Sequence, residues 1–207
     1  NRVFAITDRD RDVPTPLDDG TSVLAWDRYH IENYLLEPAF VAAAAGAVDP
    51  GSLLAHPSAC KAALEAAARA NIDRLVVEEL RAQVNASLVG SLNLGADPEA
   101  SDPGAALRPS LQASISRVTS VATAFLADGD GGLQALAKSI REGIEQAFDA
   151  DTWEVDVPGR LILQRFVHEN VPGVRYEQFR NLIINHMVEG GHEPPGMRRA
   201  IVQVLSA

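Results

Sequence analysis

Two acidic side chains that could bind a metal ion follow the first apolar run of the chain. Residues 3–6 are Val, Phe, Ala and Ile, and Asp8 and Asp10 come shortly after them. Four consecutive apolar residues suit a buried parallel strand, and open α/β sheets bind ligands at the carboxyl ends of such strands. In an extended chain Asp8 and Asp10 point to the same side, where they would repel each other unless a cation lay between them. The pattern predicts a Mg²⁺ site, although a solvated acidic turn would look the same.

The elements that would position these side chains are mostly helical. A polar loop with two prolines leads to a second predicted strand at residues 21–26, and a helix is expected from about Arg28. Apolar residues then recur every fourth position over 57–93, a linker is predicted at 95–109, and two amphipathic helices are predicted at 111–125 and 133–148. Residues 153–157 alternate like a short strand, and helices are expected from Arg160, around Phe179 and after Pro195.

This pattern predicts a mainly helical α/β chain with a small parallel sheet. We expect three regions: a strand–helix core carrying the acidic residues at 1–50, a helical insertion at 51–150, and a C-terminal segment at 151–207 that closes the core. The Leu111–Phe125 stretch has alternating spacings of four and three, which favour packing against another helix.

Composition narrows the class of protein. The 207 residues are 46% hydrophobic and carry a net charge of −10, so a globular fold is expected and non-specific binding to nucleic acid is not. The single cysteine, Cys60, excludes an internal disulfide and is expected in the core. This usage fits a reducing compartment, so we expect a cytoplasmic protein. No apolar run is long enough for a membrane span.

Two stretches of the sequence resemble a known family. Val3–Asp10, a polar loop, a short strand and Tyr29–Leu36 (Tyr-His-Ile-Glu-Asn-Tyr-Leu-Leu) are similar to the second half of a TOPRIM domain. The closest kind is attached to ATPases of the overcoming-lysogenization-defect (OLD) nuclease group. In these proteins a Trp-containing strand and a Pro-Gly-Lys turn precede a helix; Trp153–Leu163 resembles this segment, with Pro158-Gly159-Arg160 as the turn. The likeness covers residues 2–40, extends more weakly over 151–207, and does not include the helical middle.

The resemblance implies Mg²⁺- or Mn²⁺-dependent cleavage of DNA, usually gated by an ATPase domain, in a bacterial protein that defends against phage. Asp8 and Asp10 would bind the metal and Glu32 could complete a second cation position. Arg160 would approach the scissile phosphate in place of the family's lysine, keeping the charge but not the ability to carry a proton. Arg28 and His30 could contact phosphates nearby.

Two features of the family are missing from this sequence. A TOPRIM site begins with a glutamate on an earlier strand, and this chain starts after that point. There is also no Gly-x-x-x-x-Gly-Lys-Ser/Thr loop for ATP. We therefore expect an incomplete piece of a homo-oligomeric nuclease, with the ATPase in the same or another chain; loss of the glutamate in a non-catalytic relative would give the same sequence.

Two other functions fit parts of the sequence. A haloacid-dehalogenase-like phosphotransferase also opens with a strand and Asp-x-Asp, and Asp8 would then be the nucleophile. Against it, Asp12 stands where Thr or Val is expected, and Val118–Phe125 has helical spacing. A non-catalytic assembly or regulatory module would use the helical seam to bind a partner, with Glu32 as an ordinary surface carboxylate.

Overall fold

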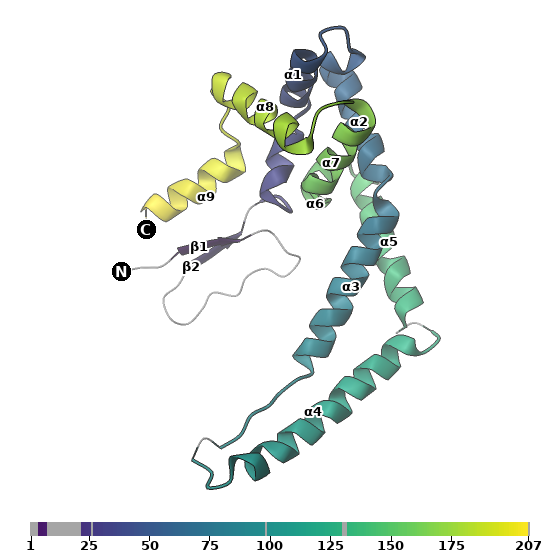
Figure 1. Ribbon diagram of the computed structural model, residues 1–207, viewed down its shortest axis with the longest axis vertical. Coiled ribbons are helices and arrows are strands. Elements are labelled where there is room, and N and C mark those ends of the chain that lie inside the picture. The colour runs from purple at the N-terminus through teal and green to yellow at the C-terminus, as the bar shows by residue number, and fades with distance from the viewer. Residues whose placement is uncertain (1–3, 8–21, 26, 98, 130–131, 207) are drawn as a thin grey trace. The chain divides into compact units, whose positions relative to one another are not determined.

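The computed structural model describes residues 4–7, 22–25, 27–97, 99–129 and 132–206. The chain divides into two compact units. Unit 1 comprises Asn1–Asn71 and Gln146–Ala207, and unit 2 comprises Ile72–Glu145. Their strands and α-helices are labelled in Figure 1.

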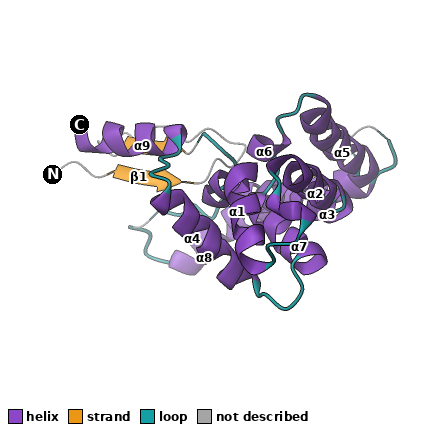
Figure 2. Ribbon diagram, turned by 90° about the horizontal axis from the view of Figure 1, so that it is seen from above, coloured by secondary structure: helices purple, strands orange, loops and turns teal. Residues whose placement is uncertain are grey.

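The strands of unit 1 form one short parallel pair. β1 (Phe4–Thr7) pairs with β2 (Ser22–Ala25), with Phe4 opposite Ser22 and Thr7 opposite Ala25. Because the pairing is parallel, the carboxyl ends of both strands lie at the same end of the pair. Figure 2 shows β1 in orange against the helices in purple.

Helices make up the core of unit 1. Prolines stand in the first turns of α1, α2 and α9. An N–H group at such a position would have no acceptor within the helix, so proline costs no hydrogen bond there. Helix α2 packs on α1 and α7, and α1 also packs on α8. The largest fully buried side chains are those of Trp153, Phe166 and Phe179. The helices are η1 (Ile31–Leu36), α1 (Pro38–Val48), η2 (Leu53–Ala55), α2 (Pro57–Arg69), α6 (Trp153–Asp156), α7 (Gly159–Asn170), α8 (Tyr176–Glu189) and α9 (Pro195–Ser206).

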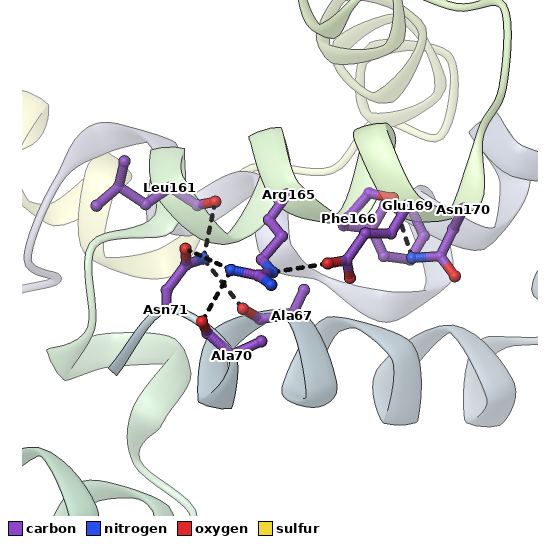
Figure 3. A network of polar contacts seen from close by, with 8 residues as sticks. All are labelled: Ala67, Ala70, Asn71, Leu161, Arg165, Phe166, Glu169 and Asn170. Carbon is purple, nitrogen blue, oxygen red and sulfur yellow. Dashed lines mark hydrogen bonds and ion pairs between the residues drawn. The ribbon is translucent and has the colours of Figure 1, made fainter. Parts of the chain in front are cut away.

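A polar network joins the end of α2 to α7 (Figure 3). The buried Asn71 amide donates to Ala67 O at 3.0 Å and to Leu161 O at 3.2 Å. Arg165 donates to Ala70 O at 2.8 Å and pairs with Glu169 at 2.7 Å. The last carbonyls of α2, which have no partner inside their own helix, are thus satisfied by α7 and by Asn71. This network fixes the position of α7, which carries Gly159 and Arg160.

Unit 2 is built from long helices. It contains α3 (Ile72–Gly90), α4 (Pro103–Leu126) and most of α5 (Leu133–Asp149). Helices α3 and α4 pack together, and the buried Ser114 hydroxyl accepts from Asn93 N and donates to Asn93 O. Asp102 caps α4 by accepting a hydrogen bond from Ala105 N at 3.0 Å.

The predicted α/β class, with a TOPRIM-like sheet, is wrong. The described residues are overwhelmingly helical, and their β structure is limited to two four-residue strands. Two such strands do not form a sheet layer on which helices could build a core. The described core is instead formed by helices packed on helices.

The predicted strand at residues 153–157 is also wrong. Trp153–Asp156 forms the helical turn α6, in which Asp156 N donates to Thr152 O and Val157 N donates to Trp153 O. Trp153 and Val157 are both buried, and their spacing of four places them on one side of a helical turn. Five residues are too few for alternation to distinguish a strand from one turn of helix.

Among the helices that the structure describes, none combines the length and the apolar character needed to cross a bilayer.

Candidate functional site

The two segments that carry the family resemblance meet at one side chain, Asn33. This residue lies in η1 and is fully buried. Its amide nitrogen donates to Glu154 O at 3.0 Å and to Val157 O at 2.7 Å, and its Oδ1 accepts from His30 N and Gly159 N, both at 3.0 Å. All four hydrogen-bonding positions of the amide are used. Asn33 therefore clamps η1 to the turn before α7, across more than 120 residues of sequence.

Gly159 is required by this contact. A Cβ atom at this position would lie 2.8 Å from both the backbone N and the Cα of Asn33. Such an approach is closer than real Cβ atoms make, and the obstacle is backbone that cannot swing away. A glycine here lets the 158–159 turn lie directly on η1, and the next residue, Arg160, is brought to the same region.

The candidate phosphate contacts Arg28 and His30 lie just before η1. Arg28 donates to Asn33 O at 2.8 Å, and its guanidinium lies 5.3 Å from the centre of the Tyr34 ring. The His30 ring packs against the Tyr29 ring at a tilt of 39°, with 4.6 Å between centroids. Both side chains are half-buried and also help to order the start of η1.

Glu32 and Arg160, predicted as site residues from distant parts of the sequence, share a neighbour in Tyr176. Tyr176 begins α8, and its pKa is raised, first by burial and then by the negative charge of Glu32, while the positive charges of Arg180 and Arg160 lower it. The Arg180 guanidinium lies 5.9 Å from the centre of the Tyr176 ring. Within the described chain, the Tyr176 hydroxyl and Arg180 Nε are buried without a hydrogen-bond partner of good geometry. The region therefore combines a carboxylate, two guanidiniums and an unsatisfied hydroxyl.

An open, mainly apolar cavity of about 350 Å³ adjoins this polar cluster. Its walls come from η1, α8 and the start of α9, all within unit 1. Glu32 and Arg180 contribute its charged edge. The lining residues are Ile31, Glu32, Tyr34, Leu35, Arg180, Ile184, Met187, Val188, Pro194 and Met197.

The predicted metal ligands Asp8 and Asp10 lie outside the described residues. Within the described ranges no three His, Cys, Asp or Glu side chains gather as a metal site would require. The metal site thus stays a prediction.

The residues of α8 and its C-terminal turn that have a metal-like spacing do not converge. His186 faces Glu189 at 3.6 Å, His192 packs on Phe40 at 4.8 Å between ring centres, and Glu193 pairs with Arg198 at 3.3 Å. Each side chain thus has a separate structural contact.

Sequence reasoning missed the roles of Asn33, Tyr176 and Arg180. An asparagine inside the apolar Ile-Glu-Asn-Tyr-Leu-Leu stretch was a usable signal, because asparagine is a poor helix former and a buried amide needs several partners. The partners themselves could not be read from the sequence, since they are mainly backbone atoms more than 120 residues away. Tyr176 and Arg180 carry no motif and become notable only through their position.

Comparisons with protein-family models, with curated proteins and with solved structures gave no match for this chain.

Proposed function

We propose that this chain contributes to a divalent-metal-dependent nuclease that cleaves DNA phosphodiester bonds. The observation that carries the proposal is the Asn33 clamp, which joins the two segments that resemble this nuclease group. Without such a contact, nothing would hold Glu32 of η1 and Arg160 of α7 in the same region. With it, both charges act on the same tyrosine, Tyr176.

In the proposed site, Asp8 and Asp10 bind Mg²⁺ or Mn²⁺, and Glu32 completes a second cation position. Asp8 and Asp10 follow β1 closely in the sequence, and the carboxyl end of β1 lies beside that of β2. The metal ions would polarise the scissile phosphate and stabilise the attacking and leaving oxygens. Glu32 is half-buried, and the positive charges of Arg160 and Arg180 act in the same region. A cation bound to the Glu32 carboxylate would have to compete with these two side chains.

Arg160 is proposed to hold the phosphate rather than to move a proton. It is exposed in the first turn of α7, and the N-terminus of a helix also favours an anion. A guanidinium can donate two parallel hydrogen bonds to phosphate oxygens and stays charged at any accessible pH. Arg28 and His30 would add contacts to neighbouring phosphates.

The wider setting is part of the same proposal. The site would work in a cytoplasmic bacterial protein, as a homo-oligomer, with an ATPase domain in the same or another chain that gates cleavage. Defence against phage DNA is the role that fits this combination.

Metal binding is the first test, because it does not require the complete catalytic machinery. Asp8→Ala and Asp10→Ala should each lower Mn²⁺ affinity, measured by calorimetric titration, by roughly tenfold or more, and Glu32→Gln by less. Asp128→Ala, which removes an exposed carboxylate in unit 2, is the matched control and should leave the affinity unchanged. Equal Mn²⁺ affinity in the wild type and in Asp8→Ala would overturn the metal assignment.

The role of Arg160 is tested separately through binding of a short DNA duplex in the presence of Ca²⁺. Arg160→Ala should weaken binding and Arg160→Lys should retain most of it, because lysine keeps the charge. Arg108→Ala, on α4 in unit 2, is the control for loss of one positive charge. If Arg160→Ala and Arg108→Ala weaken binding equally, Arg160 has no specific phosphate contact.

An assembly module is the second candidate, favoured by apolar residues exposed on the helices of unit 2. The exposed fractions of Val77, Val89 and Ile115 are 63%, 66% and 57%. Such residues on α3 and α4 suit contacts with another protein surface. A change in oligomeric mass by light scattering after Val89→Glu or Ile115→Glu, without loss of Mn²⁺ binding, would support this function.

A further inference from the structure

The cavity beside Glu32 and Arg180 has the composition of a site for a small amphipathic molecule. Its volume of about 350 Å³ falls in the range of ligand pockets, roughly 300–1,000 Å³. Ile31 and Leu35 come from η1, while Ile184 and Val188 come from α8. Ile31, Ile184 and Val188 expose 46%, 39% and 73% of their surface, so an apolar ligand would remove this surface from water.

The position of α9 against η1 makes this cavity a defined feature of unit 1. Asp27, just before η1, pairs with Arg199 of α9 at 2.9 Å and also accepts a short hydrogen bond from the Tyr34 hydroxyl. These contacts hold the Pro194–Met197 wall close to the residues of η1. Met187 and Met197 line the interior, and methionine side chains adapt readily to the shape of a ligand.

Arg180, at the charged edge of the cavity, forms no ion pair with Glu32 or with another carboxylate of the described residues. In the described part of the chain, Arg180 has no carboxylate within ion-pair distance, and its buried Nε has no acceptor. The neighbouring Tyr176 hydroxyl is also buried, and its closest polar contact is with Arg180 itself. Unsatisfied buried donors are costly, and a carboxylate can accept from a guanidinium through both of its oxygens. One such group in the cavity could therefore pair with Arg180.

The charge balance favours a single negative charge on the ligand. Glu32 also lines the cavity and would repel a bound anion, while Arg180 and Arg160 attract it. A phosphate monoester carries nearly two negative charges at neutral pH and would be repelled more strongly by Glu32. We propose that this cavity, lined by η1, α8 and α9, binds an amphipathic monocarboxylate, with the carboxylate on Arg180 and the apolar chain between η1 and α8. The proposal rests on Arg180 and the apolar walls, although Glu32 is shared with the proposed metal site.

Decanoate is a suitable probe, titrated into the purified full chain by calorimetry below its micelle concentration. We expect saturable binding at one site. Arg180→Gln should weaken it by about tenfold or more, because a charge-assisted hydrogen bond is lost. Ile184→Trp, which fills the cavity from a partly exposed position, should weaken it similarly while leaving Arg180 in place. Arg175→Gln, the same charge change at an exposed position just before α8, should leave decanoate binding unchanged.

A ligand series keeps the test decisive even if Arg180→Gln fails to fold. Wild-type protein should bind decanoate more tightly than decanol, and decanol at least as tightly as decylamine. Tighter binding of decylamine would show that Glu32 is the anchor and would overturn the proposal. So would equal decanoate affinity in wild type and a folded Arg180→Gln, or no saturable binding of decanoate. Arg180→Gln should not weaken Mn²⁺ binding, because it removes a positive charge that competes with the cation, whereas loss of a metal ligand would weaken it.

Discussion

The two units are stabilised by different kinds of contacts. In unit 1, polar side chains join segments far apart in the sequence: Asn33 reaches Val157 and Gly159, and Asn71 reaches Leu161. In unit 2, many polar contacts span four residues within one helix, such as Arg74 with Glu78. Unit 1 also fully buries three large aromatic side chains, whereas α3 and α4 leave several large apolar residues exposed.

This difference indicates where precise chemistry can be supported. A reactive group needs neighbours fixed by contacts that do not depend on a single helix, and unit 1 provides them. The contacts of unit 2 mostly stabilise long helices, and its longest-range ion pair, Arg141 with Asp73, joins two exposed side chains. The candidate site and the cavity both lie in unit 1, where the buried Asn33 bonds to backbone atoms up to 126 residues away.

The largest expected effect on stability comes from removing the clamp. Asn33→Ala would leave the carbonyl groups of Glu154 and Val157 and the N–H groups of His30 and Gly159 without their partner. We expect a loss of about 3 kcal/mol or more in the free energy of unfolding, measured with urea.

Asn93→Ala in unit 2 is the matched control for the clamp. The Asn93 side chain accepts one exposed hydrogen bond, from Gly95 N. Its removal should cost about 1 kcal/mol or less. Equal losses in the two variants would contradict the distinction between the two units.

Two glycine-to-alanine substitutions should change the free energy of unfolding in opposite directions. Gly159→Ala places a methyl group against the Asn33 backbone and should destabilise unit 1 by about 1–3 kcal/mol. Gly143→Ala lies on an exposed part of α5 with no atom within 4 Å of the new Cβ, and should stabilise unit 2 by about 0.5–1 kcal/mol. Thermal unfolding of both variants measures the contrast. A stable Gly159→Ala protein would show that the turn does not need to touch η1.

A smaller effect on stability is expected from Glu154, a half-buried carboxyl group in unit 1. Burial raises the pKa of Glu154, against the positive charges of Lys61 and Arg28. The folded state therefore holds this proton more tightly than the unfolded state, and stability falls as the pH rises through the folded-state pKa. Glu154→Gln should be more stable than wild type at pH 7, and the gain should vanish at about pH 3, below the usual carboxyl pKa of about 4.3.

The matched change in unit 2 is Glu142→Gln, which loses only an exposed pairing with Lys138 at 3.7 Å. It should alter stability at pH 7 by about 0.5 kcal/mol or less. Urea unfolding at both pH values measures the two variants. A Glu154→Gln protein less stable than wild type at pH 7 would show that Lys61 and Arg28 outweigh burial.

The smallest perturbation uses the single cysteine as a probe. Cys60 is fully buried, and burial raises the pKa of its thiol to about 12, so it should react with a disulfide reagent only when unit 1 opens. In a Cys60→Ala background, Ser116→Cys on the exposed face of α4 should react at once. Fast labelling of Cys60 in the native protein would contradict the tight packing of unit 1.

Local patterns predicted many helices but not the connections between them. The spacing from Leu133 to Phe148 matches α5, because an amphipathic stripe of that length has no other stable form. The continuous helical pattern over 57–93 hides the end of α2 at Arg69, since that end depends on Asn71 bonding to Leu161 of α7. The fold class was wrong because short apolar and alternating segments do not reveal whether a sheet grows large enough to form a layer.

The candidate site was predictable only as separate parts. Glu32 and Arg160 were selected through a family resemblance, and their common neighbour Tyr176 was not. The proposed metal ligands Asp8 and Asp10 are still supported by sequence alone. What a sequence pattern cannot supply is the contact between Asn33 and Gly159, because no local rule links residues 126 positions apart.

That contact also fixes when the site can form during synthesis. Asn33 leaves the ribosome long before residue 159 is synthesised. Its amide therefore cannot bond to its carbonyl and N–H partners until all of unit 2 has been made. Closing so large a loop is slow compared with forming the helices inside it. Unit 2 can therefore fold while the nascent chain is still growing, and the candidate site can be completed only after that. A partly made chain would thus carry the charged residues of the proposed nuclease without the clamp that joins them.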